Sequence, residues 1–196
     1  MFRQSLLPWL SLLLLLPLLQ GCVEAVVIGG AAGMATAASD RRSTGQMIDD
    51  QAIEMTIAAR YGEQPAMWQD AHVKVVSYNG IVLLAGEVPS PALRGEAVTI
   101  ARQAEGVRRV HDQLVIAPAA SFSDRTADLW LATRVKTALL GMEDLDHNPM
   151  RIKVVTRGGT VYLMGLVRRS EADAVVEKVR VMRGVKKVVK LFEYLD

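Results

Sequence analysis

The chain has 196 residues, of which 51% are hydrophobic and 22% are charged, with a formal net charge of +2. This length is enough for one ordinary domain or two small ones. The single cysteine excludes an intramolecular disulfide.

The N-terminal segment has the pattern of an export signal. Arg3 precedes an apolar run from Leu6 to Leu19, and a charged start before such a run is typical of a signal peptide. Pro8 and Pro17 interrupt the run, which is short for a permanent membrane span of about 20 residues. We therefore expect a signal peptide over residues 1–21, with a retained signal anchor as the alternative.

The signal ends in Leu19-Gln20-Gly21-Cys22, which resembles the lipobox of bacterial lipoproteins, although Gln20 is bulkier than the usual residue. In these proteins a peptidase cuts before the cysteine, and its thiol and new amine are acylated. The resemblance implies that Cys22 carries a diacylglycerol and an N-acyl chain, and several acyl chains anchor a protein effectively permanently. Val23, where Asp would retain a lipoprotein in the inner membrane, implies sorting to the outer membrane.

A small-residue segment follows the cysteine. Residues 23–39 are almost all Ala, Gly and Val. Glu24 and the glycines favour a linker lying against the bilayer over a second membrane pass. Together with the polar stretch DRRSTGQ, this predicts a tether over residues 22–48, with folded structure from Asp49.

Beyond the tether the chain repeats itself, because three blocks of sequence recur in one order. The aligned pairs are 50–61 with 128–139, 72–88 with 151–167, and 105–110 with 183–188. The blocks predict two copies of one domain, at 49–117 and 124–196, joined by a linker at 118–123.

Each copy predicts the element order αββαβ. An amphipathic helix comes first, because apolar residues recur every fourth position. A β-hairpin follows, with its turn at Asn79-Gly80 in one copy and Gly158-Gly159 in the other. A second helix begins near Ser90 and Ser170, and a final strand closes each copy. The recurring helix residues are Ile53, Ile57 and Tyr61 in the first copy and Leu131, Val135 and Leu139 in the second.

The element order, the hairpin pattern VKVV…G.V.L.G.V and the GV..V start of the last strand resemble the BON domain. Two such domains behind a lipobox are similar to outer-membrane lipoproteins of Gram-negative bacteria, over essentially the whole chain. The resemblance implies an α+β fold in which each copy has two helices on one face of a three-stranded mixed sheet.

The sequence contains no recognisable catalytic set. His72, His111 and His147 have no paired spacing. The acidic cluster 143–147 lacks the ligand periodicity and the glycine of a calcium loop. No helix follows Gly158-Gly159, which excludes a phosphate-binding loop. We expect no enzyme activity, no metal and no cofactor besides the acyl groups.

The two copies differ in charge. Residues 49–117 contain 6 Lys and Arg against 9 Asp and Glu, whereas residues 124–196 contain 14 against 10. The formal charges are therefore −3 and +4, which predicts an anionic partner for the second copy. In the cell envelope the candidates are lipid headgroups, peptidoglycan and other proteins, and we expect no nucleic acid.

The first helix of the second copy gains side chains that the shared core does not need. Trp130 and Arg134 stand where the first copy has Ala52 and Thr56. A Trp near cations is favoured at a membrane interface, and each cation there contributes about 1 kcal/mol. Packing of Trp130 between the two domains is the alternative. Helical spacing puts Trp130, Arg134 and Thr137 on one stripe, with Leu129, Thr133, Lys136 and Leu140 beside it.

The family resemblance supports the membrane interpretation. In the similar lipoproteins the second BON domain binds anionic phospholipid, such as phosphatidylglycerol, through its first helix. This implies a site here at Trp130, Arg134, Lys136 and Leu140. It also implies a role in outer-membrane integrity and enrichment at the division site. From its acidic charge, we expect the first domain to be a support or protein-docking module.

A protein adaptor is the competing hypothesis. The same helix stripe and a strand edge would then dock outer-membrane protein assembly or cell-wall machinery. Lipid binding through charge should weaken with salt, whereas an apolar protein interface should not.

Overall fold

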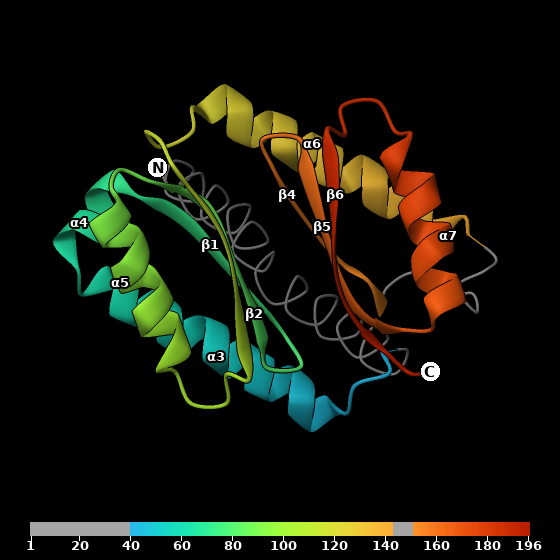
Figure 1. Cartoon of the computed structure of the whole chain (residues 1–196), viewed down its shortest axis with the longest axis horizontal. Helices are drawn as coiled ribbons and strands as arrows, with labels where there is room; N and C mark the ends of the chain where they lie inside the picture. The colour runs from blue at the N-terminus through green and yellow to red at the C-terminus, as the bar shows by residue number, and fades with distance from the viewer. Residues whose placement is uncertain (1–39, 143–150) are drawn as a thin grey trace, which may run out of the picture. The chain divides into compact units, whose positions relative to one another are not determined.

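A computed structural model describes residues 40–142 and 151–196, and residues 40–196 form one compact unit (Figure 1). Cys22, the predicted signal peptide and the acidic cluster 143–147 lie outside the described residues.

The described residues confirm the αββαβ order in both copies, with one short helix added to the first. The first copy contains α3 (Thr44–Gly62), α4 (Pro65–Asp70), β1 (His72–Tyr78), β2 (Ile81–Val88), α5 (Pro91–Arg102) and β3 (Arg109–Ile116). The second contains α6 (Phe122–Leu140), β4 (Lys153–Arg157), β5 (Thr160–Val167), α7 (Arg169–Arg180) and β6 (Lys187–Tyr194).

Two helices begin differently from the expectation. A capping box between Ser43 and Gln46 starts α3, so folded structure begins before residue 49. Ser170 lies inside α7, which instead starts where the Glu171 carboxylate accepts a hydrogen bond from Arg168 N at 2.6 Å.

Each copy forms the predicted three-stranded mixed sheet. β1 pairs antiparallel with β2, and β2 pairs parallel with β3. β4, β5 and β6 repeat this arrangement. The hairpin turns have φ of 52° at Asn79 and 71° at Gly80, and 56° at Gly158 and 82° at Gly159. Positive φ at both central positions is what a type I′ turn requires.

Helices cover one face of each sheet (Figure 1). In the first copy Ile57 of α3 packs with Val82 and Leu84 of β2, all completely buried. In the second copy Val135 of α6 packs with Leu163 in the same way. Burying each such side chain stabilises the fold by about 1.5–3 kcal/mol.

The opposite faces of the two sheets share a third core. The Tyr78 hydroxyl lies in this core and accepts a hydrogen bond from Leu166 N of the second copy at 3.2 Å. Burial, followed by the charge of Asp40, raises the pKa of Tyr78 to about 12. The two small domains therefore complete each other. The shared core contains Val76, Tyr78, Ile81, Leu83, Ala85, Val155, Tyr162, Met164 and Leu191.

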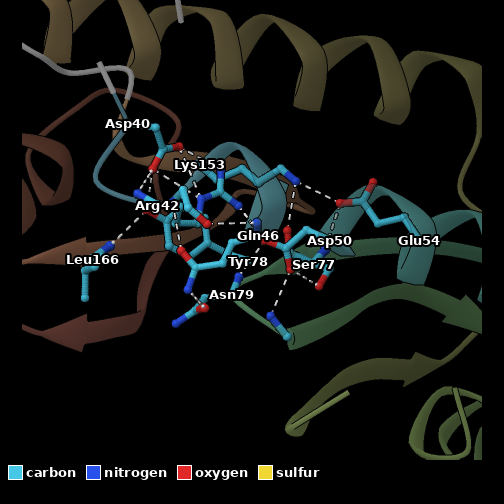
Figure 2. Close-up of polar contacts among 12 residues, drawn as sticks. Asp40, Arg42, Gln46, Asp50, Glu54, Ser77, Tyr78, Asn79, Lys153 and Leu166 are labelled. Atoms are coloured by element: carbon cyan, nitrogen blue, oxygen red, sulfur yellow. Dashed lines mark hydrogen bonds and ion pairs between the residues drawn. The ribbon is translucent and has the colours of Figure 1, made fainter. Parts of the chain in front are cut away.

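Two arginines at the start of the unit bind one copy each, and Figure 2 shows Arg42 among its partners. Arg42 lies 3.8 Å from the centroid of the Tyr78 ring and donates to the Asp50 carboxylate at 2.6 Å, both in the first copy. Arg41 donates to both carboxylate oxygens of Glu171, each at 2.7 Å, in the second copy. The segment that follows the predicted tether thus joins the two domains.

Ion pairs between the domains add to this joint. Lys153 Nζ lies 2.7 Å from Glu54 Oε1 and donates to the carbonyl oxygen of Ser77 at 3.0 Å (Figure 2). Arg157 pairs with Glu87 from the other copy. These contacts make residues 40–196 a single folding unit that includes all three cores.

Gly86→Ala should lower the free energy of unfolding by about 3–5 kcal/mol. Gly86 has φ +140°, and a Cβ there would lie 1.9 Å from the carbonyl oxygen of His72. In α5, Gly95 has no such neighbour within 4 Å, so Gly95→Ala should stabilise by about 0.5–1 kcal/mol. Urea unfolding of both variants measures the difference, and equal stabilities would contradict the close approach of β1 and β2.

Candidate functional site

The candidate site is the outward face of α6, and the core fixes which face that is. Leu131, Val135 and Leu139 are buried against the second sheet. Ser121 caps the start of the helix, because its hydroxyl accepts a hydrogen bond from Asp124 N at 3.1 Å. The residues between the buried positions therefore face solvent.

A buried carboxylate in α6 holds the helix against the neighbouring hairpin. Asp128 is 7% exposed and accepts hydrogen bonds from Gly158 N at 2.9 Å and Gly159 N at 3.3 Å. Because Leu129 and Trp130 directly follow Asp128, this anchor fixes the rotation at which they are presented.

The apolar side chains of the predicted site are largely accessible. Leu129 is 68% exposed, Trp130 66% and Leu140 61%. The alternative that Trp130 is buried between the domains is therefore wrong. All the predicted α6 residues lie on one exposed side of the helix, since the remaining ones, Thr133, Arg134, Lys136 and Thr137, are exposed as well.

The two predicted stripes are flanked by different neighbours. On the Trp130 stripe, Arg134 Nη1 donates to the carbonyl oxygen of Arg183 at 2.9 Å, which fixes the guanidinium beside the α7–β6 loop. On the Leu129 stripe, Lys136 lies near Lys74 of β1. Partial desolvation, then the charge of Lys136, lowers the pKa of Lys74. Cations therefore gather on both sides of the apolar residues.

Thr133 has a local role. Its hydroxyl donates to the carbonyl oxygen of Leu129 at 3.0 Å. This hydrogen bond stays inside the helix, so the hydroxyl is not directed at a ligand.

Phe122 belongs to the same face and was not predicted from the sequence. It is 77% exposed in the first turn of α6, seven residues before Leu129. Seven residues are close to two helical turns, so the two side chains lie on one line. The corresponding residue of the first copy is Thr44. This difference between the copies was visible in the sequence, but the aligned block of the second copy begins at residue 128 and did not include it.

The equivalent helix of the first copy lacks the cations. Ile48 and Met55 on α3 are each 64% exposed, so an apolar surface exists there too. The positions that match Arg134 and Lys136 hold Thr56 and Ala58. Of these two equivalent helices, only α6 therefore combines exposed apolar side chains with exposed cationic ones.

Neither a metal centre nor a membrane-crossing helix is found in residues 40–142 and 151–196. No group of three His, Cys, Asp or Glu side chains there could hold a metal ion. No helix in this part of the chain is long and apolar enough to cross a membrane.

The family model of the BON domain matches the chain twice, at residues 49–118 and 127–196. The chain therefore belongs to the BON-domain family, as the resemblance of its motifs implied.

Proteins of similar sequence show which members of the BON-domain family the chain resembles. The chain is 39% identical over 178 residues, 91% of each chain, to the outer membrane lipoprotein DolP of Haemophilus influenzae. It is 32% identical over 157 residues, 80% of each chain, to the 21 kDa hemolysin of Actinobacillus pleuropneumoniae. It is 30% identical over 154 residues to the osmotically-inducible protein Y of Escherichia coli, covering 76% of this chain and 75% of the relative.

The Haemophilus relative confirms the predicted resemblance to outer-membrane lipoproteins, and the family model confirms two BON domains in this chain. The chain is DolP-like, and the outer membrane is its location. The Haemophilus relative is named as a lipoprotein rather than as an enzyme.

Proposed function

We propose that the protein is a non-enzymatic lipoprotein, anchored through acylated Cys22, that binds anionic phospholipid through α6. One observation carries this proposal: α6 presents exposed Trp130 and Leu140 beside exposed Arg134 and Lys136, whereas α3 has no such cations. Phosphatidylglycerol, with its single negative charge, is the expected ligand.

The chemistry of this face suits the interface of a bilayer. An indole lies favourably at the level of the headgroups, and Leu140 can enter the acyl boundary. Arg134 and Lys136 together contribute about 2 kcal/mol near an anionic surface. This is a weak, reversible attraction, so the permanent anchor supplies residence in the membrane and α6 supplies preference for lipid composition.

The preference has a spatial consequence in the cell. A protein already held in the outer membrane can redistribute laterally toward regions rich in anionic lipid. We propose that this enriches it at the division site, where it supports outer-membrane integrity. The first domain then serves as a support whose sheet completes the shared core.

Vesicle binding of residues 40–196 tests the proposal, because this unit contains all three cores and lacks the anchor. Binding should require phosphatidylglycerol in a phosphatidylcholine bilayer. It should weaken when the Debye length falls from about 10 Å to about 3 Å with added salt. Failure to bind anionic vesicles at low salt would contradict the proposal and favour the protein-adaptor alternative.

A further inference from the structure

Each copy has a hollow at the equivalent place in its fold. In the second copy a hollow of about 630 Å³ lies between α6, the β4–β5 turn and the α7–β6 loop, and residues of the first copy and the linker, such as Glu87, Val115 and Pro118, complete its wall. In the first copy a hollow of about 490 Å³ lies between α3, the β1–β2 turn and the α5–β3 loop. The first hollow therefore serves as an internal reference for the second.

The lining of the two hollows differs in charge. Trp130 and Arg134 replace Ala52 and Thr56, as the helix comparison showed. In the loop, Arg183 replaces Glu105. This reversal lies in the aligned blocks 105–110 and 183–188 and was visible in the sequence, but only the fold places it beside Arg134.

One further loop position is basic in both copies, with different partners. Arg108 in the first copy pairs with Glu193 at 3.1 Å and donates to the carbonyl oxygen of Asn79 at 3.0 Å. Lys186 is its counterpart in the second copy. Among residues 40–142 and 151–196, neither Lys186 nor Arg183 forms an ion pair, so both charges remain available.

The carboxylates that line the second hollow are already engaged. Glu87 pairs with Arg157. Asp128 accepts hydrogen bonds from the hairpin amides, and Asp124 accepts one from the Ser121 hydroxyl at 2.6 Å. Among the described residues, none of these carboxylates forms an ion pair with Arg134, Arg183 or Lys186.

The backbone of the loop that carries two of these cations is attached to the β4–β5 turn and to α6. Lys186 N donates to the carbonyl oxygen of Gly159 at 2.8 Å. A Cβ on Gly159 would lie 3.0 Å from Lys186 Cγ and Cδ, so the lysine stem crosses directly over this glycine. Arg134 binds the backbone of Arg183. The three cations thus line one hollow together with Trp130, on a loop whose backbone is fixed to α6 and to the hairpin turn.

We propose that this hollow is the headgroup site, in which Arg134, Arg183 and Lys186 bind the phosphodiester of one anionic phospholipid beside Trp130. The inference rests on the proposed function and adds two residues outside α6 to it. Arg and Lys are the side chains that pair with phosphate oxygens through charge-assisted hydrogen bonds. Binding should accordingly depend on where the charges lie, not only on the net charge.

The test is binding of residues 40–196 to phosphatidylcholine vesicles with and without phosphatidylglycerol. The double variant Arg183→Ala/Lys186→Ala should bind the anionic vesicles about 30-fold more weakly, from about fivefold per cation. Arg134 keeps its hydrogen bond, because it contacts the backbone of residue 183. The matched control, Arg102→Ala/Lys178→Ala, removes the same charges at exposed positions away from the hollow and should stay within about threefold of wild type.

Each outcome bears on a different claim. Equal weakening of both double variants would overturn the headgroup site and leave net charge as the cause. Unchanged binding of Arg183→Ala/Lys186→Ala would overturn the site while the proposed function of α6 stands. If the wild-type protein does not bind anionic vesicles, both the headgroup site and the proposed function of α6 are overturned. Arg183→Glu, which restores the first copy's charge, should by itself weaken binding by about 30-fold, because it removes one attraction and adds a similar repulsion.

A soluble phosphate compound distinguishes a lipid headgroup from a free phosphate as the ligand of this hollow. Glycerol 3-phosphate, compared with sodium chloride at equal ionic strength, should not release the protein from the vesicles, because it lacks the acyl chains that contact Trp130 and Leu140. Selective release by glycerol 3-phosphate would overturn the lipid assignment and point to a soluble phosphate ligand.

Discussion

Trp130→Ala and Arg134→Glu should each weaken binding of residues 40–196 to phosphatidylglycerol vesicles by about 30-fold. The charge reversal removes an attraction of about 1 kcal/mol and adds a similar repulsion, and about 2 kcal/mol corresponds to about 30-fold in affinity. Loss of the indole removes a large apolar contact of similar value. Vesicle flotation across a lipid titration measures both effects.

Matched variants keep this prediction specific to α6. Met55→Ala shortens an exposed apolar side chain on the equivalent helix α3, and Arg102→Glu repeats the charge change at an exposed position on α5. Both should bind within about threefold of wild type. If they weaken binding as much as the α6 variants, the membrane contact is not the outward face of α6.

Asp50→Ala should lower the free energy of unfolding by about 3–5 kcal/mol, as expected when a buried charge network loses one partner. Asp50 is 3% exposed and holds the first hairpin turn against α3. Its carboxylate accepts hydrogen bonds from Gly80 N at 2.8 Å, Asn79 N at 2.6 Å, Ser77 Oγ at 2.6 Å and Arg42 Nη1 at 2.6 Å (Figure 2). Thermal and urea unfolding measure the loss.

The same variant should change the response to acid. Burial opposes ionisation of Asp50, but the hydrogen bonds from Gly80, Ser77, Asn79 and Arg42 outweigh it and hold its pKa below the ordinary value. A depressed carboxyl pKa contributes stability that is present above the unfolded value of about 3.9 and is lost as the pH falls through the folded value. Asp50→Ala should therefore flatten the fall in stability below about pH 4.

An exposed acid provides the control for this prediction. Asp173 lies on the surface of α7, so Asp173→Ala should change stability by less than about 0.5 kcal/mol at neutral pH. A loss of similar size in both variants, or an unchanged acid response in Asp50→Ala, would show that the hairpin network does not carry the stability assigned to it.

The repeat made much of the candidate site predictable from the sequence. Two copies of one fold share core positions such as Ile57 and Val135, so a difference at Trp130 or Arg134 stands out as unnecessary for folding. This comparison identified the α6 face without any alignment of relatives. It missed Phe122 because the aligned block started too late along the helix.

The exposure of Trp130 could not be predicted, because it depends on which surfaces the two domains use to pack together. They pack through the outer faces of their sheets, including Leu83 and Met164, and this leaves α6 uncovered. β2 is buried along its whole length, and its continuous apolar sequence is consistent with burial on both faces. The second face of β2 is covered by the sheet of the second copy, whose residues lie far along the chain.

The beginning of the folded unit was placed too late for a related reason. The stretch DRRSTGQ is polar and was expected to be loose. Its Arg41 and Arg42 instead find carboxylate partners in Glu171 and Asp50, and Ser43 with Gln46 caps α3. The capping box was recognisable locally, and Arg42 and Asp50 are only eight residues apart. The pair between Arg41 and Glu171 spans 130 residues, a distance that sequence spacing does not indicate.

Fluorescence of Trp130 on vesicles tests the central claim most directly. In residues 40–196 carrying Trp68→Phe, Trp130 is the one remaining indole. Its emission should shift to shorter wavelength and be quenched by lipids brominated in the acyl chains, and only when the vesicles contain phosphatidylglycerol. If the protein binds these vesicles while the indole stays accessible to aqueous acrylamide, α6 is not the surface that meets the membrane.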